Sequence, residues 1–419
     1  MIEERTLDER CVSALRFLSV DSIELANSGH PGLPLGAAPM AYVLWSRHLR
    51  HDSADPAWPD RDRFVLSAGH GSALLYSLLH LFGYDLPREE LQRFRQWGSR
   101  TPGHPESGLT PGVEVTTGPL GQGFANAVGL AIAERHLAAT FNRPRHAVVD
   151  HATFALVGDG DLMEGISYEA AALAGHLRLG KLIVLYDSND VSLAGATALA
   201  TSENVASRFT AAGWRVAHVA DGNDLVALDQ ALTDARGSGD RPTLIEVKTV
   251  IGYGAPTKQG THGVHGAPLG PEETRGAKAA LDWPEAPVFH VPDEVRAHAA
   301  GLARRAATAH AEWTRRIASY REAFPDLAAE LARRLSGSLP AAWENAVPSF
   351  PSDPKGLATR KASEAILQAV APVLPELMGG SADLNPSTLT WLRSFGDFES
   401  PPSPSPPIQG AVGPAWSYA

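Results

Sequence analysis

The stretch "HATFALVGDGDLMEG", residues 151–165, runs from apolar residues through Gly-Asp-Gly into a pattern typical of a helix. A second apolar run, "KLIVLYDSND" at 181–190, also ends in acidic and amide residues, and the helical segment 165–177 lies between the two. A strand, a helix and another strand in this order predict a right-handed crossover between neighbouring parallel strands.

The same alternation occurs elsewhere in the chain. Residues 62–72 predict a strand, a glycine turn and a helix that begins near Ser72, and residues 116–138 predict a glycine turn and a long helix. Residues 241–252 predict a further strand. Strands that alternate with helices are typical of a parallel sheet covered on both faces, so we expect an α/β fold.

The composition changes along the chain and predicts four parts. Residues 1–284 form the main α/β domain, and residues 285–355, which are rich in Ala, Arg and Glu, form a helical linker. Residues 356–395 begin a second, incomplete α/β unit in which a helix leads into a strand. Residues 396–419 are rich in Pro, Ser and Gly and predict a loop or a disordered tail.

The overall composition excludes several classes of protein. Hydrophobic residues make up 44% and charged residues 20% of the 419 residues, as in ordinary globular proteins. A net charge of -11 argues against nucleic acid as a partner, because phosphate binding needs clustered Lys and Arg. The single cysteine, Cys11, excludes an internal disulfide. Since no membrane span or signal peptide is evident, we expect a cytoplasmic protein that does not bind membranes.

Asp159 and Asn189 each follow a predicted strand. Parallel strands joined by a right-handed crossover end at the same edge of the sheet, where ligands of open α/β sheets bind. Two side-chain oxygens and a backbone carbonyl suit Mg²⁺, or the similar oxygen-binding Ca²⁺, next to a diphosphate. The competing interpretation makes Asp159 the N-cap of the following helix. The asparagine that ends the second run favours the metal–diphosphate site.

Five histidines lie in glycine- or proline-rich loops: His30, His70, His104, His262 and His265. Any one of them is more often structural or merely exposed, but five in such loops favour a ligand site. Their spacing matches no zinc motif. Imidazoles can instead donate hydrogen bonds to phosphate or hydroxyl oxygens and transfer protons near neutral pH.

Two weaker signals concern phosphate. "TTGPLGQG" at 116–123 resembles a phosphate-binding loop but matches neither the dinucleotide nor the P-loop pattern. Arg360 in "TRKAS" and Ser387 in "NPST" are candidates for binding a phosphorylated substrate, since arginine forms a fork that fits phosphate. Taken alone, these two residues are better explained by a surface ion pair and a helix cap.

In combination, these motifs resemble the transketolase family of thiamine-diphosphate enzymes. The motifs that carry the resemblance are "SGHPG", "DRFVLSAGHGS", "TPGHPE", "TTGPLGQG", "VGDG" with "DSND", "GTHGVHGAPLG", "TRKAS" and "GGSADLNPST". They occur in the order of the family along most of the chain. Deoxyxylulose-phosphate synthases and phosphoketolases share the Gly-Asp-Gly and Asn elements but not this full set.

The resemblance implies transfer of a two-carbon ketol unit from a ketose phosphate to an aldose phosphate, in the pentose phosphate pathway, by a homodimer. The implied ligands of Mg²⁺ are Asp159, Asn189 and the carbonyl of Val191. The implied contacts of thiamine diphosphate are His70, Gly118, Leu120, Gly160, Asn189, His265 and, in the opposite subunit, Asp383. The implied catalytic residues are His30 and His265. The implied contacts of the sugar phosphates are His30, His104, His265, Arg360 and Ser387. Glu164 is implied to face the subunit interface.

One departure from the family bears on activity. The resemblance implies a glutamate that protonates the aminopyrimidine of the cofactor, within an Arg-Glu stretch after "SADLNPST". This chain reaches Ala419 without such a stretch, so we expect a truncated chain that transfers ketol units negligibly by itself.

Two alternatives follow from the residues. The first is a non-catalytic fragment that binds thiamine diphosphate and Mg²⁺ or dimerises with full-length subunits. The second is an aldolase or kinase acting on sugar phosphates, which is disfavoured because the chain has no P-loop and no evident setting for a Schiff-base lysine.

Overall fold

A parallel sheet organises the part of the chain that carries most of the predicted site. The computed structural model describes residues 6–237, 239–381, 384–400 and 417–418. The chain divides into one unit from Met1–Arg135 and Asp150–Thr314 and another from His136–Val149 and Arg315–Ala419. The sheet lies in the first unit.

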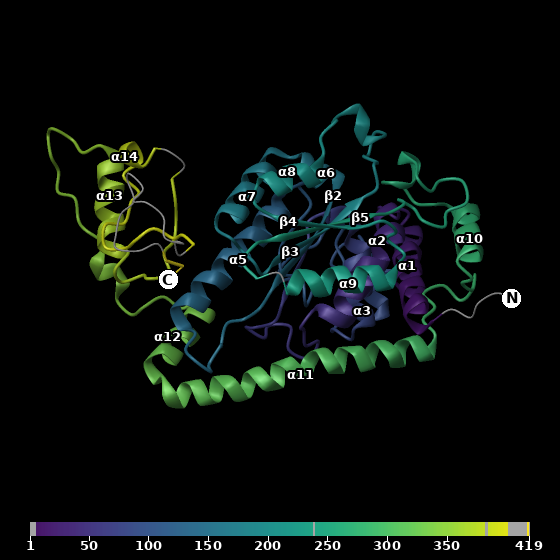
Figure 1. The fold of residues 1–419 in the computed structure, drawn as a ribbon, viewed down its shortest axis with the longest axis horizontal. Helices are drawn as coiled ribbons and strands as arrows, with labels where there is room; N and C mark the ends of the chain where they lie inside the picture. The colour runs from purple at the N-terminus through teal and green to yellow at the C-terminus, as the bar shows by residue number, and fades with distance from the viewer. Residues whose placement is uncertain (1–5, 238, 382–383, 401–416, 419) are drawn as a thin grey trace. The chain divides into compact units, whose positions relative to one another are not determined.

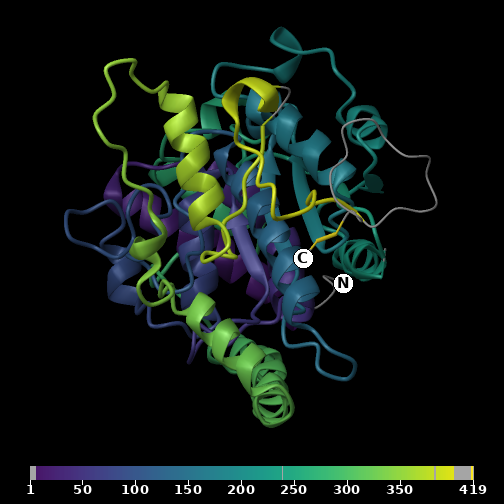
Figure 2. The same ribbon diagram turned by 90° about the vertical axis from the view of Figure 1, so that its left-hand side faces the viewer.

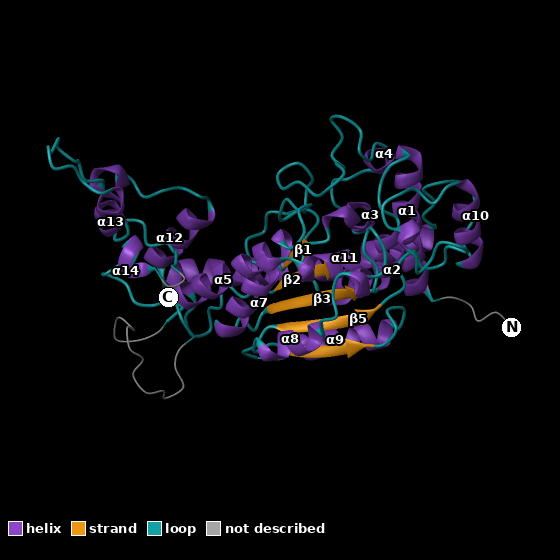
Figure 3. Cartoon of the chain, turned by 90° about the horizontal axis from the view of Figure 1, so that it is seen from above, coloured by secondary structure: helices purple, strands orange, loops and turns teal. Residues whose placement is uncertain are grey.

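All neighbouring strands of this sheet are parallel, and their order is β1-β2-β3-β5-β4 (Figure 3). The strands are β1 (Arg63–Leu66), β2 (Thr153–Gly158), β3 (Leu182–Ser188), β4 (Arg215–Val219) and β5 (Thr243–Lys248). β2 and β3 pair directly, with Gly158 opposite Asp187. The predicted parallel arrangement of these two strands is therefore confirmed.

Helices cover both faces of the sheet, which confirms the predicted α/β class (Figure 1). Phe154, Leu156, Ile183 and Leu185 alternate along β2 and β3, and all are buried in one hydrophobic core. That core also includes residues of α1 (Leu7–Ala26), α2 (Gly32–Val43), α3 (Ser72–Leu81) and α9 (Leu225–Arg236). The helices of the other face are α5 (Gln122–Phe141), α7 (Gly165–His176) and α8 (Val205–Ala211).

An aromatic group supports this second face. The ring of Trp214 lies 4.9 Å from that of Phe209 and 6.0 Å from that of Phe124. The indole N–H of Trp214 also donates to the carbonyl of Ala171 in α7, at 2.8 Å. These contacts join α5, α7 and α8 to the start of β4.

The remaining helices are shorter or lie towards the carboxyl end of the chain. They are α4 (Arg88–Gln92), α6 (Asp159–Met163), α10 (Pro271–Ala280), α11 (Asp293–Ala323), α12 (Pro325–Leu335), α13 (Thr359–Val370) and α14 (Asn385–Thr388). A π-helical turn spans Leu44–His48, and 3₁₀ turns span Gly69–Gly71, Thr197–Leu199, His262–Val264 and Trp343–Ala346. Within the described residues, none of the helices is both long and apolar enough to span a bilayer.

The second unit contains α12, α13 and α14, with an irregular segment leading into α13 (Figure 2, yellow-green). Arg333 of α12 forms ion pairs with Glu330 and with Glu376, which lies beyond α13. The prediction of a strand after α13 is wrong: the described residues from 371 to 381 form turns and loop. A strand is stable only when a neighbour satisfies its hydrogen bonds, and no strand neighbour occurs in the described part of this unit. Most of the predicted tail, 396–419, lies outside the described residues.

Candidate active site

Asp159 and Asn189 lie side by side at the carboxyl edge of the sheet. One carboxylate oxygen of Asp159 accepts hydrogen bonds from the backbone N–H groups of Asn189, at 3.3 Å, and Asp190, at 3.2 Å. The other accepts from the hydroxyl of Tyr186 at 2.5 Å. The N-cap of α6 is Gly158, so the carboxylate of Asp159 faces the end of β3 and does not cap its own helix. The N-cap interpretation is therefore wrong.

The side chain of Asn189 is held in a fixed orientation. Its amide nitrogen donates to Asp187 at 3.0 Å, and its amide oxygen accepts from the N–H of Val191 at 3.1 Å. The hydroxyl of Thr249, just after β5, donates to the other oxygen of Asp187. Asp187 therefore links the asparagine to the neighbouring strand.

The charge at this edge favours a bound cation. Burial and the nearby carboxylate of Asp159 together raise the pKa of Asp187 to about 7. Burial also raises the pKa of Asp159, and the carboxylate of Asp190 adds to that effect. A divalent cation beside these oxygens would compensate their charge. The described residues hold no cluster of three or more His, Cys, Asp or Glu suited to a metal, but the expected ligand set uses only one such residue.

The glycine-rich loop 116–123 lies against the same region. Gly118 has a φ of +151°, and a Cβ added there would lie 3.4 Å from the ring of His104. A Cβ on Gly160 would lie 3.1 Å from Leu120, so these two predicted cofactor contacts are neighbours. The two glycines thus let the loop, the Gly-Asp-Gly turn and a histidine approach one another closely.

Four of the five histidines form one cluster. The ring of His30 lies 5.3 Å from that of His70, 6.4 Å from that of His104 and 5.9 Å from that of His265. The rings of His70 and His265 stack at 5.0 Å. His262 is exposed at the start of a 3₁₀ turn and is absent from these ring contacts.

The clustered imidazoles are neutral at physiological pH. Burial, with a smaller effect of the neighbouring imidazoles, lowers the pKa of His70 to about 3. Burial, Arg95 and the neighbouring imidazoles together lower the pKa of His30 to about 4. Burial also lowers the pKa values of His104 and His265. Neutral imidazoles can donate one hydrogen bond and accept another, which suits binding of carbonyl and hydroxyl oxygens.

Of the other predicted site residues, three are exposed and one lies outside the described residues. Glu164 is exposed and is the N-cap of α7. Arg360 in α13 and Ser387 in α14 are exposed residues of the second unit. Asp383 lies outside the described residues. The assigned roles of these four residues stay predictions.

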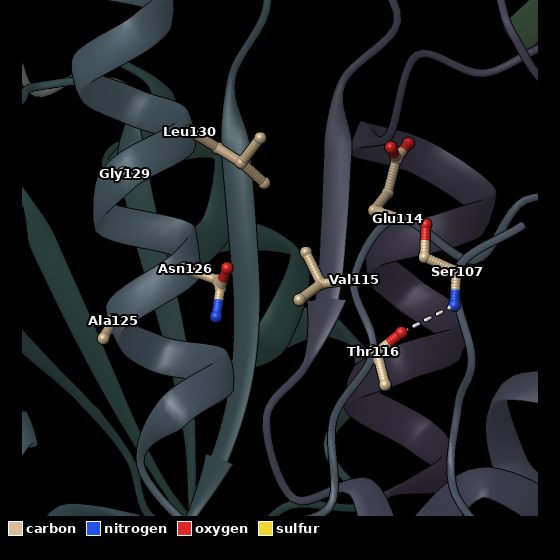
Figure 4. Close-up of a pocket in the computed structure, with 8 residues that line it drawn as sticks. All are labelled: Ser107, Glu114, Val115, Thr116, Ala125, Asn126, Gly129 and Leu130. Carbon is tan, nitrogen blue, oxygen red and sulfur yellow. Dashed lines mark hydrogen bonds between the residues drawn. The ribbon is translucent and has the colours of Figure 1, made fainter. Parts of the chain in front are cut away.

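A separate open hollow adjoins the loop before the glycine turn (Figure 4). Glu114, Val115 and Thr116 face Asn126 and Leu130 of α5 across it. The N–H of Ser107 donates to the hydroxyl of Thr116 at 3.0 Å. This hollow exposes one side of α5 next to the loop that carries Gly118 and Leu120.

Comparison with known proteins identifies the family of this chain. Residues 7–340 match the family model described as "Transketolase, thiamine diphosphate binding domain". The chain belongs to the transketolase family. It is 56% identical to the transketolase of Geobacillus stearothermophilus and 54% identical to that of Bacillus subtilis (strain 168), in each case over 394 residues. Those alignments cover 94% of this chain but only 59% of each relative.

Solved structures agree. The transketolase of Leishmania mexicana matches with a TM-score of 0.91 and 48% identity, covering 95% of this chain and 59% of that one. The transketolase of Pichia stipitis in complex with sedoheptulose 7-phosphate matches with a TM-score of 0.90 and 46% identity, covering 94% and 58%. The resemblance inferred from the motifs is thus confirmed, and the matched region is a thiamine-diphosphate-binding domain.

Sequence reasoning missed an important residue of this transketolase domain, Asp161. Its carboxylate accepts from the hydroxyl of Ser67 at 2.7 Å and from the N–H groups of Gly121, at 2.8 Å, and Gly158, at 3.0 Å. The hydroxyl of Ser67 in turn accepts from the N–H of Phe124 at 3.0 Å. Asp161 therefore fastens the Gly-Asp-Gly turn to the glycine-rich loop and to the end of β1. Its position two residues after Asp159 was the available signal.

Proposed function

We propose that this chain provides the diphosphate- and Mg²⁺-binding part of a transketolase site. That site would transfer a two-carbon ketol unit from a ketose phosphate to an aldose phosphate. The observation that carries the proposal is the position of Asp159 and Asn189 at one sheet edge of a transketolase-family domain. The cluster of neutral histidines adds support, because it offers donors and acceptors suited to sugar oxygens.

Each predicted residue has a role in this proposal. A carboxylate oxygen of Asp159, the amide oxygen of Asn189 and the carbonyl of Val191 hold Mg²⁺. Bound thiamine diphosphate supplies the nucleophilic carbon and the electron sink. The contacts that orient this cofactor are those of His70, Gly118, Leu120, Gly160, Asn189 and His265. His30 and His265 touch the substrate and assist proton transfers at its oxygens, and His104 binds substrate hydroxyls.

The second unit and a partner subunit complete the proposal. Arg360 and Ser387 bind the phosphate of the sugar, and Asp383 reaches the cofactor of an opposite subunit. A homodimer is supported by the exposed apolar side chains of Ile166, Tyr168 and Leu173 on α7, next to Glu164. We also propose domain boundaries at residues 284, 355 and 395 and a cytoplasmic location.

A second candidate is a chain that binds thiamine diphosphate and Mg²⁺ without turnover. It is favoured by one observation: Asp159 and Asn189, the residues proposed to anchor the metal and the diphosphate, lie together in the first unit. The chain spans about 59% of the length of the curated relatives it matches. Purified chain, given cofactor, Mg²⁺ and a ketose phosphate with an aldose phosphate, distinguishes the two. Ketol transfer above background supports the first candidate, and cofactor binding without transfer supports the second.

Calorimetric titration with thiamine diphosphate and Mg²⁺ tests the site that both candidates share. We expect binding by the unaltered chain and its loss in Asp159→Ala. The matched control is Asp234→Ala, which removes an exposed carboxylate of α9, away from this edge of the sheet. That carboxylate accepts a hydrogen bond from the side chain of Gln230 at 2.9 Å. Absence of binding by the unaltered chain, or equal affinity of both variants, refutes the proposed metal site.

A further inference from the structure

Arg95 points its guanidinium at the histidine cluster from a constrained backbone position. It follows α4 with a φ of +61°, a left-handed conformation that is uncommon for a residue other than glycine. Its N–H donates to the carbonyl of Thr101 at 2.9 Å, which closes the turn. One terminal nitrogen donates to the hydroxyl of Ser28 at 3.0 Å, and the other lies 3.2 Å from Nδ1 of His30.

The chemistry of this contact fixes the tautomer of His30. A guanidinium has only donors, so Nδ1 of His30 must act as the acceptor. Neutral His30 therefore carries its proton on Nε2. A Cβ added to Gly266 would lie 3.3 Å from Nε2 of His30. The absence of a side chain at Gly266 therefore leaves space beside Nε2.

The surroundings of His30 reinforce the neutral form. Among the described residues, the charged or titratable groups that act on it are Arg95 and the imidazoles of His70, His104 and His265. Burial is the largest cause that lowers the pKa of His30 to about 4, and Arg95, His265 and His104 contribute to the same shift. A second proton at Nδ1 would have to displace the hydrogen bond from the guanidinium.

We propose that Arg95 is a positioning residue that holds His30 as the neutral Nε2–H tautomer, so that His30 donates a hydrogen bond to a substrate oxygen and does not act as a base through Nδ1. The tautomer itself follows from the contacts of Arg95. Its role towards a sugar phosphate rests on the proposed function.

The test is nitrogen NMR of the full chain labelled with ¹⁵N-histidine, without ligand, with the His30 signal identified by its loss in His30→Gln. In the unaltered chain we expect the Nε2–H pattern throughout the neutral range. In Arg95→Met we expect a population of the Nδ1–H tautomer and about a tenfold rise in the proton affinity of His30. Arg95→Lys, which keeps a cationic donor, should restore the original pattern at least in part.

The matched control is Arg93→Met, because Arg93 lies two residues away and pairs with Glu90 at 3.1 Å. It should leave the His30 signal unchanged. An Nδ1–H pattern in the unaltered chain, or identical spectra and titrations for Arg95→Met and Arg93→Met, overturns the proposal. If Arg95→Met fails to fold, Arg95→Leu, which also lacks a donor, gives the same comparison. The measurement needs no turnover, so absence of cofactor binding would refute the proposed function and leave this inference standing.

Discussion

Replacing Asp161 should strongly destabilise the first unit, because its carboxylate joins three separate segments. The side chain is fully buried, and its three donors come from β1, the glycine-rich loop and the end of β2. Asp161→Ala leaves all three donors without a partner. Because each buried unsatisfied group costs about 1–3 kcal/mol, and the structure relaxes in part, we expect a loss of about 3–5 kcal/mol in the free energy of unfolding.

Asp161→Asn separates the contribution of the single oxygen that faces Gly158. With its amide oxygen towards Ser67 and Gly121, the asparagine places an NH₂ group against the N–H of Gly158, so two donors face each other. We expect a loss of about 1–3 kcal/mol, intermediate between the wild type and Asp161→Ala. Guanidinium denaturation followed by tryptophan fluorescence measures both variants.

The control for Asp161 is Asp224→Ala. Asp224 caps α9 by accepting from the N–H groups of Val226 and Ala227 at an exposed helix end. Water can replace its carboxylate there, so we expect a loss of only about 1 kcal/mol. If Asp161→Ala costs no more than Asp224→Ala, Asp161 does not join the three segments as described.

Three further predictions concern other parts of the first unit. Burial lowers the pKa of His51 from 6.5 to about 4, so the folded protein holds this histidine neutral. Its contribution to the free energy of unfolding is therefore complete above pH 6.5 and is lost as the pH falls towards 4. The total loss is about 3 kcal/mol. Urea unfolding of His51→Phe should lose less stability between pH 7 and 5 than the wild type does, and an equal loss contradicts the assignment. A Cβ on Gly175 would lie 1.7 Å from the carbonyl oxygen of Ala212, so Gly175→Ala should lower the melting temperature, whereas Gly129→Ala, with open space around it, should not. Asp187→Ala should weaken binding of thiamine diphosphate with Mg²⁺ about 10–100-fold in calorimetry, because the acceptor that orients Asn189 is lost. Unchanged affinity would contradict that role.

The elements that carry local signals could be predicted from the sequence. β2 and β3 are continuous apolar runs, and each ends at the polar residues that form the candidate site. Asp159 and Asn189 could be placed together because a crossover unit leaves its strands side by side. β4 escaped prediction because its residues Arg215–Val219 are mostly exposed or half-buried and have no apolar run.

The partners of the site residues could not be predicted, because they are distant in sequence. Asp161 finds Ser67 at a separation of 94 residues and Gly121 at 40, and Arg95 finds His30 at 65. No periodicity or spacing rule reports such pairs. The prediction of a strand after α13 was wrong for a related reason: an apolar segment forms a stable strand only if a neighbouring strand is present to pair with it.

Asp159 and Asp161 have identical side chains in one turn, but their surroundings differ. Each accepts three hydrogen bonds, and burial raises the pKa of each. Asp161 is completely enclosed, so both of its oxygens are committed to the protein. Asp159 is only partly buried, faces the carboxylates of Asp187 and Asp190, and lines a polar cavity with Lys248. An accessible oxygen among like charges is where a cation gains most, which favours Asp159 for the proposed metal site, whereas the enclosed Asp161 serves the structure of the turn.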